Sequence, residues 1–142
     1  MKSIVLDTGY WIALFNPEKN SKKQDIVKVV SELIDENNYN ILIPFPTLYE
    51  FLNTKLSRNK TKIDFDVEFS KSKYQKIPDT LYRDKALKNF SNLFSFGHSD
   101  VSLVDEVIKE MIDDIGLPID YIVTFDEALK NFAIANNVEA IE

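Results

Sequence analysis

The chain has 142 residues, is 44% hydrophobic and carries a formal net charge of −6, which suits one folded domain over residues 1–142 rather than a disordered chain. It has no cysteine and one histidine, which excludes disulfides, thiolate metal sites and sites built from several histidines. No apolar run reaches the roughly 18 residues of a membrane helix and no signal peptide precedes the first strand, so we expect a cytoplasmic protein with no membrane partner.

The first predicted strand, residues 3–6, is short and mostly apolar, and Asp7 follows it at once. The next apolar run, residues 10–15, predicts a short helix that ends before Asn16 and Pro17. A strand buried on both faces is typical of a parallel sheet covered by helices. Ligands of such sheets bind outside the carboxyl ends of the strands, so Asp7 lies where an α/β protein binds its ligand.

Strand and helix patterns alternate through the rest of the chain, which indicates an α/β fold. Thr47 and Glu50 match a capping box at the start of one helix, and Asp79, Ser102 and Asp126 are candidate caps of later helices. The predicted helices cover residues 22–36, 47–58 and 80–94, and two more begin after Ser102 and Asp126. The predicted strands cover residues 41–43, 74–77, 121–124 and 138–141, and residues 63–69 show a strand period.

Four carboxylates, at Asp7, Glu50, Asp105 and Asp126, follow predicted strands or lie in the first turn of predicted helices. The fold would bring these positions to one edge of the sheet. Each could instead serve a helix terminus alone, either as an N-cap or in a capping box. Two carboxylates about 4 Å apart repel by roughly 4 kcal/mol at an effective dielectric near 20. A cluster of four therefore needs protons or a cation, and hard oxygen ligands suit Mg²⁺ or Mn²⁺.

Four segments of the sequence together resemble the PIN-domain family, and in particular the stand-alone toxin ribonucleases of the VapC type. They are SIVLDTGYWIAL, PFPTLYEFL, VSLVDEVIKEMI and IVTFDEALKNFA, in this order along the chain. The resemblance covers essentially the whole chain and is weakest over residues 57–78. It implies a three-layer α/β/α sandwich around a short parallel sheet and metal-dependent cleavage of RNA. For a toxin it also implies a cognate antitoxin, and we expect a homodimer.

The acidic positions of the family fall on the same four carboxylates. We expect Asp7, Asp105 and Asp126 to bind metal, and Glu50 to bind metal or to orient the attacking water. Thr8 and Thr124 are expected to hydrogen-bond to the metal ligands. Gly9 is a departure, because such proteins often have a serine there.

The carboxylates by themselves, without the resemblance, also indicate metal-dependent hydrolysis of a phosphodiester. Hydrolysis of a phosphodiester needs a strong nucleophile and neutralisation of charge on the leaving oxygen. One or two Mg²⁺ or Mn²⁺ ions supply both, without a catalytic histidine or serine.

The charges are unevenly distributed along the chain. Residues 55–88 hold ten basic and five acidic side chains, whereas residues 89–142 hold two basic and eleven acidic ones. One interpretation is a basic rim for RNA phosphates beside an acidic metal centre. The other is a set of solvated faces without a binding role. The candidate RNA contacts are Lys55, Arg58, Lys60 and Lys62.

Other interpretations remain open. Receiver and haloacid-dehalogenase-like domains also place acids at strand ends around Mg²⁺, although Gly9 stands where the second aspartate of the latter would be. A catalytically inactive scaffold that binds RNA or protein is a further alternative. Tyr10, Trp11 and Tyr49 fit core or dimer contacts better than base-stacking platforms.

Overall fold

The sheet of the protein is parallel, as the sequence predicts. The computed structural model describes residues 1–15, 21–53, 67–68, 70–71, 73–95, 97 and 102–141. Within this part of the chain, five strands lie in the order β3-β2-β1-β4-β5, and every neighbouring pair is parallel. The strands are β1 (Ser3–Leu6), β2 (Asn40–Pro44), β3 (Tyr74–Ile77), β4 (Tyr121–Val123) and β5 (Glu139–Ala140).

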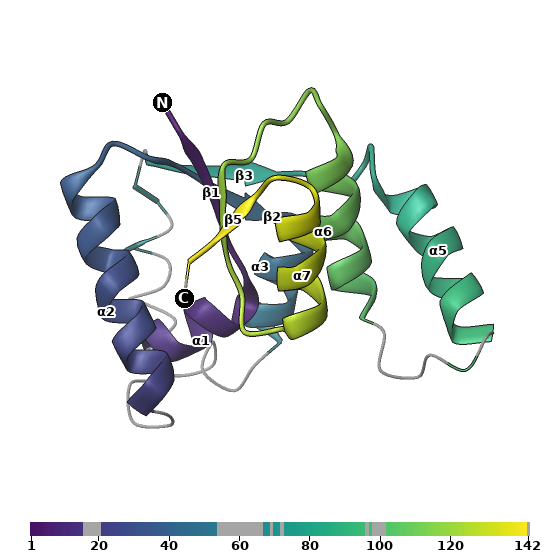
Figure 1. The fold of residues 1–142 in the computed structure, drawn as a ribbon, viewed down its shortest axis with the longest axis horizontal. Coiled ribbons are helices and arrows are strands. Elements are labelled where there is room, and N and C mark those ends of the chain that lie inside the picture. Colours follow the sequence, from purple (N-terminus) through teal and green to yellow (C-terminus); the bar gives the residue numbers. More distant parts are fainter. Residues whose placement is uncertain are drawn as a thin grey trace.

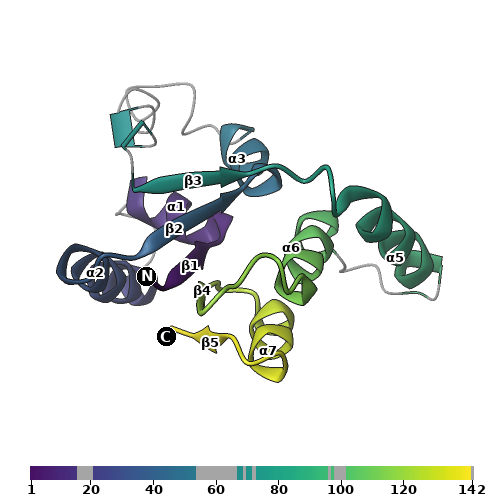
Figure 2. The ribbon, with the colours of Figure 1, turned by 90° about the horizontal axis from the view of Figure 1, so that it is seen from above.

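Helices cover both faces of this sheet and complete the expected three-layer sandwich (Figures 1 and 2). The helices of one face are α1 (Thr8–Phe15), α2 (Ser21–Glu36) and α3 (Phe45–Leu52), and those of the other are α5 (Arg83–Ser95), α6 (Leu103–Asp113) and α7 (Glu127–Ala135). Alternate residues of β1 point to opposite faces, so Ile4 and Leu6 join one apolar core while Val5 joins the other. Helix α5 packs mainly on α6 and is the helix farthest from β1 (Figure 2).

The strand order places the candidate site. The chain moves from β1 outward to β2 and β3, and then returns to the other side of β1 for β4 and β5. The point of reversal lies between β1 and β4, where open parallel sheets leave a crevice at the carboxyl ends of their strands. Asp7 follows β1 and Thr124 follows β4, so both residues lie at this crevice.

Three predicted elements differ from the structure. Helix α3 begins at Phe45 with Pro44 as its N-cap residue and no side-chain cap, so the capping box at Thr47 and Glu50 is wrong. Proline is tolerated in the first turn, where its missing N–H would have no partner, and Pro46 therefore lies inside the helix. Helix α5 begins at Arg83, because residues 79–82 form a turn in which Asp79 accepts through its backbone carbonyl.

The strand predicted over residues 63–69 is wrong at the two of these residues that the structure describes. Val67 and Glu68 are helical, while residues 63–66 and 69 lie outside the described residues. Helix α3 ends at Leu52 with Asn53 as its C-cap residue, so its predicted extension is wrong at Asn53, while residues 54–58 lie outside the described residues. In the part of the chain that the structure describes, no helix combines the length and the hydropathy needed to span a bilayer.

Candidate active site

Asp7 is a buried carboxylate with two hydrogen bonds. Its side chain is 8% exposed, and it accepts from Thr8 N at 2.8 Å and from Thr124 Oγ1 at 2.8 Å. Burial raises the pKa of Asp7, and the hydrogen bonds from Thr124 and Thr8 oppose part of that rise. The negative charges of Glu50 and Asp126 raise it further. Asp7 is thus a costly buried charge that its surroundings hold in one orientation.

Thr124 joins Asp7 to Asp126. The Thr124 hydroxyl donates to Asp7 and accepts from the backbone N–H of Asp126 at 3.1 Å. One oxygen of Asp126 accepts from Leu129 N at 2.8 Å, so Asp126 is also the N-cap of α7. Asp126 is exposed, and a carboxylate has acceptor capacity beyond that one hydrogen bond. The capping interpretation is therefore correct for one oxygen of Asp126, and the other oxygen remains available for a further ligand.

Asp105 lies in the first turn of α6, where Ser102 caps the helix by accepting from Asp105 N at 3.4 Å. Its side chain is half-buried. Burial and then the negative charges of Asp7, Asp126 and Glu50 raise the pKa of Asp105 to about 7, against a small opposing effect of Lys109. The four predicted carboxylates are therefore close enough to influence one another, although they come from four different elements.

Glu50 occupies the outer side of this group. It lies in the second turn of α3 rather than the first, because the helix begins at Phe45. Its side chain is exposed, in contrast to that of Asp7. The negative charge of Glu50 raises the pKa of Asp7 and of Asp105, so Glu50 lies near both of these carboxylates.

The fit of a divalent cation can be judged from the donor atoms and their charges. Among the described residues, no three carboxylate or histidine side chains are close enough to form a ready-made metal site. Electrostatic repulsion acts over longer distances than coordination, which explains why the same carboxylates raise each other's pKa. The donor set consists of hard oxygens in a concentrated negative charge, and this chemistry fits Mg²⁺ or Mn²⁺.

Two buried hydroxyls near the carboxylates have no hydrogen-bond partner among the described residues. They are Thr8 Oγ1 and Thr47 Oγ1. Thr8 therefore contacts Asp7 through its backbone N–H, whereas Thr124 contacts it through the predicted hydroxyl. Thr47 lies one helical turn before Glu50, and sequence reasoning assigned it to a cap that the structure does not have. Unpaired buried hydroxyls are uncommon in proteins.

The glycine at position 9 is explained by close packing against a neighbouring side chain. A β-carbon at Gly9 would lie 2.8 Å from Phe125 Cδ2, a distance that real side chains do not reach. Phe125 lies between Thr124 and Asp126, and the Nζ of Lys23 lies 4.8 Å from its ring centroid. The place that a serine side chain would occupy is thus filled by an aromatic ring.

The remaining predicted residues divide into three groups. Tyr10 and Trp11 are buried in the core, as expected. Tyr49 is 53% exposed, so it is not a core residue. The predicted RNA contacts lie outside the described residues, namely Lys55, Arg58, Lys60 and Lys62.

No protein-family model matches this sequence, and a search of curated proteins finds no match. Solved structures, by contrast, match over almost the whole chain. The Mycobacterium tuberculosis toxin VapC20, described as cleaving the sarcin-ricin loop, has a TM-score of 0.68 at 20% identity, over 98% of this chain and 99% of that one.

Two further structures have a TM-score of 0.60. VapBC2 from Rickettsia felis, bound to a DNA fragment from its promoter, is 20% identical over 97% of this chain and 96% of that one. FitAcB from Neisseria gonorrhoeae is 17% identical over 98% and 96%. These similarities show the fold, and they confirm the PIN-like, VapC-type architecture that the sequence motifs predict.

Proposed function

We propose that this protein is a metal-dependent endoribonuclease, and the toxin of a toxin–antitoxin pair. The observation that carries the proposal is the hydrogen-bonded series from Asp126 through Thr124 to the buried Asp7, at the carboxyl ends of the neighbouring strands β1 and β4. Asp105 and Glu50 add their negative charge to the same place. A buried and oriented carboxylate surrounded by other negative charges is favourable when a cation binds there, whereas helix capping alone does not require such a group of charges.

Asp7, Asp105 and Asp126 would hold the cation, with Glu50 as a fourth ligand or as the group that orients water. Mg²⁺ or Mn²⁺ bound there supplies water activation and neutralises charge at the scissile phosphate. Thr124 fixes the rotamer of Asp7 through its hydroxyl, and the N–H of Thr8 fixes the other carboxylate oxygen. Leu129 N similarly restrains Asp126.

The assignment of substrate and partners rests on the resemblance in sequence and fold. VapC20 is described as a toxin that cleaves the sarcin-ricin loop, which favours RNA as the substrate class. The likeness to VapC-type toxins favours a cognate antitoxin. A homodimer is proposed on the same resemblance. Lys55, Arg58, Lys60 and Lys62 are the proposed phosphate contacts, from their charge in the sequence.

Cleavage of a mixed pool of single-stranded and structured RNA tests this function. Wild-type protein should cut the pool with Mg²⁺ or Mn²⁺ and stop when EDTA is added, and the products should carry 5′-phosphates because water is the nucleophile. Asp105→Asn should abolish cleavage without unfolding the protein. Asp113→Asn is the matched control, because Asp113 is an exposed residue at the other end of α6. An Asp105→Asn protein that is less stable and still cuts RNA would show that Asp105 serves only the helix.

A further inference from the structure

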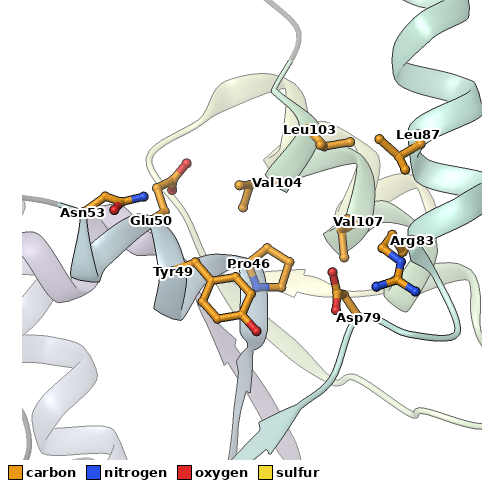
Figure 3. Close-up of a pocket in the computed structure, with 10 residues that line it drawn as sticks. All are labelled: Pro46, Tyr49, Glu50, Asn53, Asp79, Arg83, Leu87, Leu103, Val104 and Val107. Atoms are coloured by element: carbon orange, nitrogen blue, oxygen red, sulfur yellow. The ribbon is translucent and has the colours of Figure 1, made fainter.

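A cavity of about 420 Å³ lies beside the carboxylates, between α3 on one side and α5 and α6 on the other (Figure 3). Glu50 lines it and is also one of the four carboxylates, while Val104, on the opposite wall, directly precedes Asp105. The cavity therefore shares Glu50 with the candidate active site and adjoins it. A volume of this size is within the range of small-molecule sites in proteins.

The cavity has apolar walls and polar groups at a few points. Pro46 and Tyr49 of α3 face Val104 and Val107 of α6 across it. The Tyr49 ring is held in place by Phe45, with the two ring centroids 5.9 Å apart. Its 53% exposure leaves much of its surface open to a ligand. The polar groups are Glu50, Asn53, Asp79 and Arg83.

We propose that this cavity binds one unpaired nucleobase of the RNA, next to the phosphate at the carboxylates. The inference rests on the proposed nuclease function and names a subsite of it. Unpaired RNA bases are recognised by stacking on aromatic side chains and by hydrogen bonds to their edges. Tyr49 supplies the aromatic surface, and the valines of α6 supply the opposite apolar wall.

The charge of the cavity favours a base over a phosphate. Glu50 and Asp79 carry two negative charges against the single positive charge of Arg83. A phosphate would be repelled there, whereas a base is neutral and carries both donors and acceptors. The carboxylates accept from an exocyclic amino group, and Arg83 or Asn53 donates to a carbonyl oxygen. Guanine and cytosine have both groups, while adenine lacks the carbonyl and uracil lacks the amino group, so the cavity should prefer guanine or cytosine.

Nucleosides test this subsite without involving the metal site, because they lack a phosphate. Guanosine, cytidine, adenosine and uridine are added at millimolar concentration to the metal-free full chain, and amide and methyl signals are followed by NMR. Guanosine or cytidine should shift the signals of Tyr49, Asn53 and Val104 more than adenosine or uridine does. Tyr49→Ala should weaken binding roughly tenfold, and Tyr49→Phe should retain it, because stacking needs the ring and not the hydroxyl.

Leu52→Ala is the matched control, since Leu52 is an exposed apolar residue of α3 that does not line the cavity. Its binding of nucleosides should equal that of wild type. Unchanged signals at Tyr49 and Val104 with all four nucleosides would overturn the subsite even if the protein cuts RNA. If the NMR signals of the cavity residues instead shift with protein concentration in the absence of nucleoside, and sedimentation shows a dimer, the cavity is a contact with a second copy of the chain and the base subsite is refuted. Guanosine or cytidine binding by a protein that cuts no RNA would retain the base site and refute the nuclease.

Discussion

Thr124 Oγ1 donates a 2.8 Å hydrogen bond to Asp7 Oδ2, across 117 positions of the sequence. The same oxygen accepts from Asp126 N at 3.1 Å, so one hydroxyl fixes the ends of two neighbouring strands. Thr124 and Asp7 are both buried. A hydrogen bond to a buried charge is among the stronger hydrogen bonds in a protein.

Thr124→Val should destabilise the metal-free protein at pH 7 by roughly 1.5 to 3 kcal/mol, because a buried carboxylate loses a donor. The loss should shrink at acidic pH, where a protonated Asp7 no longer needs that donor. RNA cleavage should fall about 10- to 100-fold, as for other residues that orient metal ligands. Urea unfolding at pH 7 and pH 4 measures the first effect. Thr124→Ser keeps the hydroxyl and should stay near wild type; a larger loss in Thr124→Ser than in Thr124→Val would locate the effect in the methyl group, which valine retains.

Asp105→Asn should make the metal-free protein more stable at pH 8 and leave it unchanged near pH 3. The pKa of Asp105 is raised from 3.8 to about 7 in the folded protein. Between these values the folded state binds more protons than the unfolded state, so stability falls as pH rises, and the full penalty is present above pH 7. Asparagine removes the ionisation. The gain should be about 1 kcal/mol, because water screens a half-exposed carboxylate.

Thermal unfolding from pH 3 to pH 8 measures this difference. Asp113→Asn is again the control and should follow the wild-type curve. A variant that is destabilised equally at every pH would mean that the position matters for the helix and not for the charge cluster.

Mn²⁺ or Mg²⁺ should raise the melting temperature of the wild-type protein, since a cation that binds only the folded state stabilises it by mass action. At a concentration 100 times the dissociation constant the gain is about 2.7 kcal/mol, which is roughly 10 °C for a domain of this size. Asp7→Asn should lose most of this response. If Asp7→Asn and wild type respond equally, Asp7 is not a ligand.

Gly9→Ala should destabilise the protein by about 1 to 3 kcal/mol, because the new methyl group would overlap the Phe125 ring. Phe125→Leu should relieve the overlap, so the double variant should be more stable than the sum of the single changes predicts. Chemical denaturation of the four proteins of this cycle gives the coupling. Strictly additive effects would show that the two sites do not contact.

Removing the charges of Lys55, Arg58, Lys60 and Lys62 should weaken RNA binding and flatten its dependence on salt, if they touch phosphates. Each lost contact should reduce the slope of log K against log salt by a little under one unit. Filter binding of RNA at several salt concentrations measures it. Unchanged affinity with an unchanged slope would return this segment to the interpretation of a solvated face.

The sequence alone determines much of this architecture, because its signals are local. Short apolar runs define β1 and β2, and the caps at Ser102 and Asp126 define the starts of α6 and α7. The position of Asp7 directly after a buried strand is enough to place it at the ligand-binding edge of a parallel sheet. Pro44 and Pro46 indicate a strand-to-helix junction, but they do not say whether the helix begins before or after the second proline. The predicted capping box is wrong for that reason.

Tertiary structure alone decides the properties that depend on distant partners. The strand order places β4 beside β1, and only then can Thr124 reach Asp7. The raised pKa of Asp105 combines its own burial with the charges of three other elements, so no window of sequence contains it. Tyr49 has the apolar character of a core residue, and yet it lies exposed beside the cavity that α3, α5 and α6 line. Periodicity reports which residues are apolar along one element, whereas exposure, ionisation and cavities depend on what the rest of the chain packs against it.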